Sequence, residues 1–204
     1  LSSRDLSRLS QVCMGLHTSV AAYLLFACSI RRRLSYWFTD IESFRELQRC
    51  TGLLVSGSVA LSIFERVRYR NTDIDLYVLS DQWKPVTSFM LRSGYQLVSA
   101  NSKDRRYEWD SRHYLGYHLP GISAIVDFID DAGRQAQVIF AVYSPLDVVL
   151  GFHSTVVMNV ISHSGAVCLY PYSTFVLRRS IVFGYTASED KRVDITQKYG
   201  RRGW

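Results

Sequence analysis

Apolar residues recur every three or four positions through most of residues 1–40, which is the spacing of one helix face. A second run of this kind, IESFRELQRC, follows Thr39 and Asp40, either of which can cap a helix, and it stops at Gly52. The pattern therefore predicts an N-terminal part made of helices over residues 1–50.

Residues 51–143 change to short apolar or alternating segments separated by helical ones. The segments LLVS and DIDLYVL predict strands on either side of a helix that begins near Ser58, and WKPVTSFMLR predicts another helix before the strand GYQLV. Residues 114–144 alternate like two strands joined around Gly133. Strands interleaved with helices indicate an α/β or α+β core.

Residues 144–204 predict a helical C-terminal part. Ser144 can cap a helix, and Pro145 suits its first position. The apolar segment that follows predicts one buried helix to about residue 162. The last 36 or so residues give no clear pattern. No repeat or linker divides the chain, so we expect one domain over residues 1–204.

Composition narrows the classes of partner. The 204 residues are 48% hydrophobic, which is typical of a globular protein, and a net charge of +6 favours anionic partners such as nucleotides, nucleic acid or acidic lipid. Four widely spaced cysteines without a CxxC pair argue against a zinc ribbon or a disulfide framework. They favour an intracellular location, cytoplasmic or nuclear.

Residues 12–30 are long enough to span a bilayer and are followed by three arginines. His17, Thr18 and Ser19 interrupt the apolar run. We therefore expect a buried or partly buried helix here and no membrane partner.

Candidate chemistry lies in the stretch SGSVALSIFERVRYRNTDIDLYV. On a strand, Asp73 and Asp75 project to the same face, and two close carboxylates repel each other unless a cation such as Mg²⁺ or Mn²⁺ lies between them. Gly57 allows a sharp turn, and Ser58 begins a helix whose free N–H groups can bind phosphate. The alternative interpretation is two solvated charges on an ordinary strand.

The pair Gly57-Ser58 followed by DIDLYV resembles the signature of the DNA polymerase β-like nucleotidyltransferase superfamily, a GS turn with DxD on the next strand. The longer stretch SGSVALSIFERVRYRNTDIDLYV, with GFHSTVVMNVIS and KYGRRGW downstream, is similar to an uncharacterised nucleotidyltransferase-like group from mushroom-forming fungi. The resemblance implies a mixed β-sheet with flanking helices of nucleotidyltransferase type.

It also implies transfer of a nucleoside monophosphate from an NTP such as ATP to a hydroxyl, with pyrophosphate leaving. Asp73 and Asp75 would bind two Mg²⁺ or Mn²⁺ ions, and a third carboxylate from a neighbouring strand normally completes the site. The acceptor is left open as RNA, a protein or a small molecule.

Two residues compete for the third position. Asp127 in AIVDFID is flanked like an inward-pointing strand residue, whereas the second strand of the predicted hairpin carries Gln137, a neutral amide that cannot act as a base. With Asp127 as catalytic residue and third metal ligand, the chain would be an active transferase. With Gln137 there, it would be a catalytically degenerate nucleotide- or RNA-binding module of the same fold.

Other residues offer weaker candidates. Arg66, together with Arg68 and Arg70, could reach a triphosphate or an acceptor phosphate, or lie on the solvated surface. His153 and Asn159 are expected to be core residues, with substrate contact by His153 as the alternative.

His113 and His118 stand among tyrosines and could flank a base-binding cleft. They have no partner at metal-ligand spacing.

Overall fold

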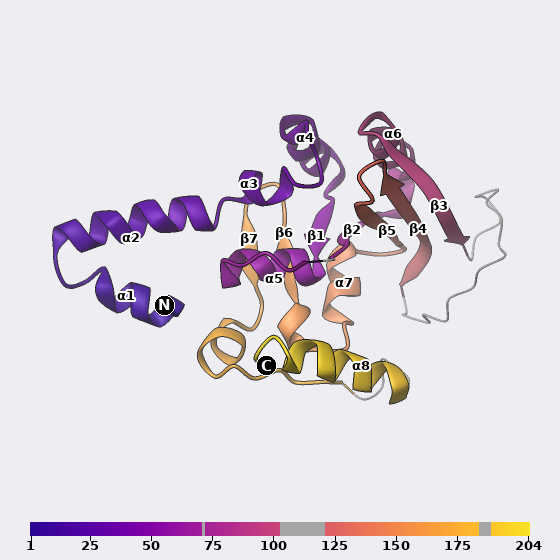
Figure 1. The fold of residues 1–204 in the computed structure, drawn as a ribbon. Helices are drawn as coiled ribbons and strands as arrows, with labels where there is room; N and C mark the ends of the chain where they lie inside the picture. Colours follow the sequence, from indigo (N-terminus) through magenta and orange to yellow (C-terminus); the bar gives the residue numbers. More distant parts are fainter. Residues whose placement is uncertain (71, 103–120, 184–188) are drawn as a thin grey trace.

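The computed structural model describes residues 1–70, 72–102, 121–183 and 189–204, and its first four helices form the N-terminal part (Figure 1). They are α1 (Ser3–Leu9), α2 (Met14–Ala27), α3 (Ile30–Leu34) and α4 (Ile41–Thr51). The Asp40 carboxylate caps α4 by accepting a hydrogen bond from the Ser43 N–H at 3.0 Å, and Gly52 ends it at a φ of +68°. The helices predicted here are confirmed.

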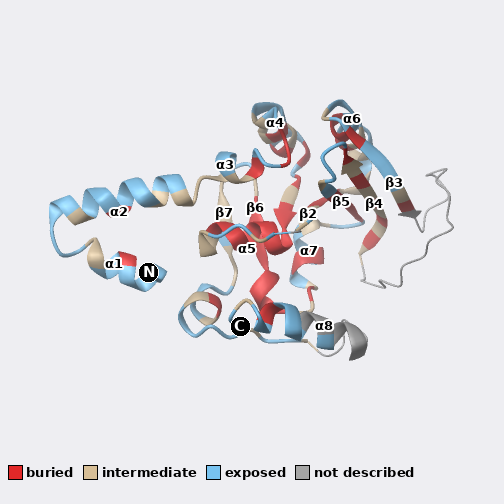
Figure 2. Ribbon diagram, in the orientation of Figure 1, coloured by how far each residue is buried: buried red, intermediate tan, exposed pale blue. Residues whose placement is uncertain are grey.

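Helices α1 and α2 project from the body of the molecule, and most of their residues are exposed (Figure 2). In α2, Leu25 is 79% exposed, while Val20 is buried. No helix in the described parts of the chain has the length and apolar character needed to cross a membrane.

A mixed seven-stranded sheet forms the centre of the fold, in the order β3-β4-β5-β2-β1-β6-β7. Strands β2 and β5 are parallel, and the five other neighbouring pairs are antiparallel. The expected mixed sheet with flanking helices is confirmed. Its strands are β1 (Leu54–Ser56), β2 (Ile74–Leu79), β3 (Tyr95–Ser102), β4 (Ile122–Asp130), β5 (Gln135–Ala141), β6 (Asn159–Ile161) and β7 (Ala166–Cys168).

One face of the sheet is covered by helices over most of its strands, although Leu97 of the edge strand β3 is 46% exposed. Alternate residues of β4, such as Val126 and Phe128, are buried against α4 and against α6 (Trp83–Arg92), which follows the short η1 (Ser80–Gln82). Phe44 of α4 and Phe89 of α6 contribute aromatic rings to this core. Such alternation is what a strand with two unlike faces requires.

The opposite face is only partly covered. It packs on α7 (Pro145–Leu150), on the 3₁₀ turn η2 (Thr155–Val157) and on Tyr199 of α8 (Glu189–Gly200), while α5 (Gly57–Glu65) joins β1 to β2. On this face the odd-numbered residues Ile125, Asp127 and Ile129 of β4 keep some solvent contact. Polar side chains can therefore occupy it without full desolvation.

The single helix expected over residues 144–162 is wrong beyond Leu150. Ser144 does cap α7, but the helix ends at Gly151. The apolar segment that follows forms η2 and then β6, which pairs with β1 and β7. An apolar run rich in Val and Ile fits a buried strand as well as a buried helix, so the pattern did not distinguish them. The rest of the C-terminal part contains the single-turn π-helix η3 (Tyr172–Val176) and α8.

Candidate functional site

A row of polar side chains crosses the partly covered face of the sheet. Register places Asp75 of β2 beside Ser56 of β1 on one side and beside Gln137 of β5 on the other. Gln137 in turn lies beside Asp127 of β4, which lies beside Ser99 of β3. Residues in register point to the same face, so one row gathers these five side chains.

The Gly57 turn and the Asp75 carboxylate touch. Gly57 has a φ of +65°, and a Cβ built on it would lie 2.2 Å from Oδ2 of Asp75. Glycine is therefore required both by the backbone conformation and by the space. The side chain of Ser56, the N-cap of α5, makes no capping hydrogen bond, so it leaves the N–H groups of the first helical turn available to a ligand.

The electrostatics of Asp73 and Asp75 favour a bound cation. Burial, and then the negative charge of Asp73, raise the pKa of Asp75 to about 7. Burial also raises the pKa of Asp73, and Asp127 adds to this through its charge, while Lys198 opposes it. Among the described residues, none donates a hydrogen bond to Asp75, so its charge is poorly compensated without an ion.

A cavity of about 330 Å³ opens beside Asp75, within the range of small-molecule sites. Gly57 and the polar side chains of Ser58, Asp75, Gln137, His153 and Lys198 line part of it. Its remaining wall is apolar or aromatic and includes Tyr77, Ile122, Ile125, Ile139, Val148, Phe152 and Val157. A phosphate-bearing group and a flat apolar group could therefore bind side by side.

The C-terminal segment brings Lys198 into this cavity and Arg202 against Ser58 of its lining, which the sequence interpretation did not foresee. Nη1 of Arg202 donates to Oγ of Ser58 at 3.0 Å, and the Arg202 guanidinium lies 4.0 Å from the ring centre of Tyr69. Lys198 lines the cavity one helical turn earlier. The available signal was the basic sequence KYGRR, although Arg202 lies beyond the end of α8 at Gly200.

His153 also lines the cavity, and its contact with a substrate stays a prediction. Its Nε2 is buried and has no hydrogen-bond partner among the described residues. Burial, and then the charge of Lys198, lower the pKa of His153 to about 4, so the imidazole is neutral at pH 7. Asn159 is buried in β6, where its Nδ2 donates to the Val156 carbonyl at 2.8 Å. His113 and His118 lie outside the described residues.

Gln137, and not Asp127, occupies the strand next to the DxD strand. Nε2 of Gln137 donates to Oδ1 of Asp127 at 2.8 Å, and Oγ of Ser99 donates to Oδ2 of Asp127 at 2.6 Å. Asp127 thus lies one strand further from Asp75, with both oxygens engaged. Within the described ranges, no three His, Cys, Asp or Glu side chains are grouped so as to hold a metal. The oxygens that could hold one belong to Asp73, Asp75 and the Gln137 amide.

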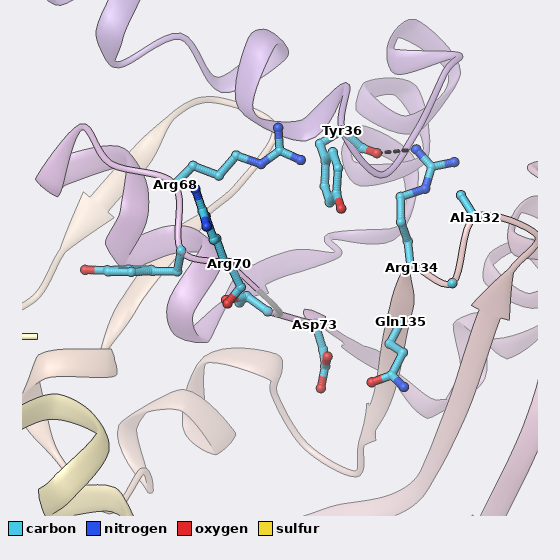
Figure 3. Close-up of a pocket in the computed structure, with 10 residues that line it drawn as sticks. Tyr36, Arg68, Arg70, Asp73, Ala132, Arg134 and Gln135 are labelled. Carbon is cyan, nitrogen blue, oxygen red and sulfur yellow. Dashed lines mark hydrogen bonds between the residues drawn. The ribbon is translucent and has the colours of Figure 1, made fainter. Parts of the chain in front are cut away.

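The three arginines between α5 and β2 have different surroundings. Arg66 donates to Oγ of Ser3 and to the Leu1 carbonyl, both at 2.8 Å, and lines neither cavity beside the DxD motif. Arg68 and Arg70 line a second cavity of about 740 Å³, on the Asp73 side (Figure 3). The DxD motif therefore stands between two cavities.

Comparison with known proteins supports the fold alone. No protein-family model matches the chain, and no curated protein matches it. Among solved structures, the apo form of a CCA-adding enzyme is similar, with a TM-score of 0.51 and 13% sequence identity. The match covers 81% of this chain but 39% of that enzyme, so this chain spans well under half of its length. The two chains share a nucleotidyltransferase-type fold.

Proposed function

We propose that the chain binds a nucleoside triphosphate together with Mg²⁺ or Mn²⁺ and transfers the nucleoside monophosphate to a hydroxyl. The observation that carries the proposal is the contact between the Gly57 turn and the Asp75 carboxylate, which puts a phosphate-binding helix end and a carboxylate in one cavity. The fold shared with a CCA-adding enzyme is consistent with it.

The residues around the cavity would have different roles in binding. Asp73 and Asp75 would hold the cation, and Ser58, Lys198 and Arg202 would bind the triphosphate oxygens. When bound, the cations lower the pKa of the attacking hydroxyl and neutralise charge on the phosphates. The apolar wall with Phe152 would contact the base.

The transfer balances as a single displacement. The acceptor oxygen forms a bond to the α-phosphorus, the bond from that phosphorus to the bridging oxygen breaks, and pyrophosphate leaves. The hydroxyl proton passes to solvent, because Gln137 offers no basic group and the Asp127 carboxylate is engaged by Gln137 and Ser99. A missing general base costs about 10²–10⁴ in rate, so we expect a slow enzyme.

The test is calorimetry with ATP, with and without Mg²⁺, followed by measurement of pyrophosphate release over RNA, protein and small-molecule acceptors. We expect binding that needs the metal and transfer that is lost in Asp73→Ala and Asp75→Ala. Transfer at the wild-type rate in the double variant would refute the proposal. The exposed Asp147 of α7 lines neither cavity, so Asp147→Ala serves as the matched control.

A second candidate function is a nucleotide- or RNA-binding module without catalysis. The position of Gln137 beside Asp75 favours it, since an amide replaces a carboxylate where a base would act. Metal-dependent ATP binding with no pyrophosphate release on any acceptor would establish this second function and exclude the first.

A further inference from the structure

The larger cavity is lined by Asp73 and not by Ser58, and its lining is mostly charged and polar. Asp73 stands at one end, and Arg68, Arg70 and Arg134 surround the space with Tyr36 (Figure 3). Its volume of about 740 Å³ is more than twice that of the cavity beside Asp75. There is room for more than a single ion.

The positive charge of this cavity is only partly compensated. Arg134 is paired with Asp130 at 2.5 Å and donates to the Tyr36 carbonyl. Arg68 and Arg70 are exposed and have no ion-pair partner among the described residues. Burial, and then the charges of Arg32 and Arg68, lower the pKa of Arg33, so a further cation lies near Arg68.

Arg68 is held in a defined position even though it is unpaired. Its guanidinium lies 3.5 Å from the ring centre of Tyr36, and Arg134 lies 5.7 Å from the same ring. Stacking on an aromatic ring orients a guanidinium and leaves its N–H groups free to donate. Two unpaired guanidiniums, one of them oriented in this way, form a ready site for a phosphate group.

We propose that this cavity binds a phosphate group carried by the acceptor, so that the acceptor hydroxyl reaches Asp73 while its phosphate lies on Arg68 and Arg70. The proposal rests on the proposed function and names the acceptor class: a hydroxyl compound with a phosphate monoester or diester, either a free nucleotide or the end of a nucleic-acid strand. Both sources offer the same chemistry to the arginines.

Calorimetric titration with three probes tests the class of ligand. AMP and a trinucleotide RNA carry phosphate, and adenosine does not. We expect AMP or the trinucleotide to bind and adenosine to bind at least about tenfold more weakly, since charge-assisted hydrogen bonds to phosphate are lost. Tighter binding of the trinucleotide than of AMP would identify a strand end as the source, and the reverse a free nucleotide. Equal binding of adenosine and AMP would overturn the proposal.

Variants test the place of binding. Arg68→Gln/Arg70→Gln should weaken AMP or trinucleotide binding at least about tenfold and leave Mg²⁺-dependent binding of a non-hydrolysable ATP analogue unchanged. Arg202→Gln should do the opposite, because Arg202 contacts Ser58. Arg92 is exposed on α6 and bonds to Ser88, so Arg92→Gln is the matched control.

The proposal fails if the double arginine variant binds the phosphate probes like wild type, or if Arg202→Gln weakens them as much as it weakens the ATP analogue. Failure of the proposed function looks different: the ATP analogue would not bind wild type at all, while the probes would still respond to Arg68 and Arg70.

Discussion

Asp75→Asn should stabilise the metal-free protein at neutral pH. The pKa of Asp75 rises from 3.8 to about 7 in the folded state, which corresponds to about 4 kcal/mol against ionisation at about 1.4 kcal/mol per pKa unit. Asp75 keeps some solvent contact and is coupled to Asp73, and the amide has its own burial cost, so we expect a gain of about 2–3 kcal/mol at pH 8.

The pH dependence follows from the direction of the shift. Below pH 3.8 the Asp75 carboxyl is protonated in both states and has no effect. From pH 3.8 to about 7 the unfolded chain releases this proton while the folded chain keeps it, so the free energy of unfolding falls as pH rises. The advantage of Asp75→Asn should therefore be small at pH 4, grow through pH 7 and then level off.

Urea unfolding in EDTA at pH 5 and pH 8 measures the effect, and for a chain of this length thermal midpoints should differ by about 5–10 °C at pH 8. Asp81 is exposed in η1, and Asp81→Asn is the control, with no comparable gain. Added Mg²⁺ should stabilise wild type and not Asp75→Asn. An Asp75→Asn protein that is no more stable than wild type at pH 8, or whose advantage shrinks from pH 5 to pH 8, would refute the reasoning.

Three further changes probe the same site. Gly57→Ala should destabilise the fold by about 1–3 kcal/mol, because its Cβ would meet Oδ2 of Asp75 at 2.2 Å in a backbone conformation with positive φ. Urea unfolding measures this loss. Gly165→Ala is the control, since a Cβ there meets nothing within 4 Å. Gln137→Glu should raise the rate of pyrophosphate release by about 10²-fold by supplying a basic group beside Asp75, and an unchanged rate would argue against the catalytic interpretation. His153→Gln should leave the dependence of ATP affinity on pH unchanged between pH 6 and 8, since His153, with a pKa of about 4, is neutral over this range. A calorimetric pH series in which ATP affinity changes near pH 6.5 in wild type alone would contradict this.

Helix ends and turns could be predicted from the sequence where a single residue type suits a single backbone geometry. Asp40 and Gly52 mark the ends of α4, and Gly57-Ser58 marks the turn into α5, because caps and turns with positive φ depend on few neighbours. The expectation that both aspartates lie on one strand and project to one face holds for Asp75 only. Strand β2 begins at Ile74, so Asp73 precedes it, and the two residues line different cavities.

Features that depend on strand order could not be read from the sequence. Whether Asp127 or Gln137 lies next to Asp75 is decided by β5 pairing in parallel with β2, a contact between residues about sixty positions apart. Lys198 lines the same cavity as Ser58, and Arg202 bonds to Ser58, only because the C-terminal segment folds back. Nε1 of Trp204 donates to the Thr174 carbonyl at 2.7 Å in this segment.

The position of the DxD motif between the two cavities has a consequence for the order of events in a reaction. With Asp75 facing one cavity and Asp73 the other, two substrates can occupy the protein together without competing for space. Initial velocities measured against both concentrations should then give intersecting double-reciprocal lines, the signature of a ternary complex, and no covalent enzyme intermediate should accumulate. Under the proposed function, pyrophosphate would leave from the cavity lined by Ser58, and the product would leave from the cavity lined by Arg68 and Arg70.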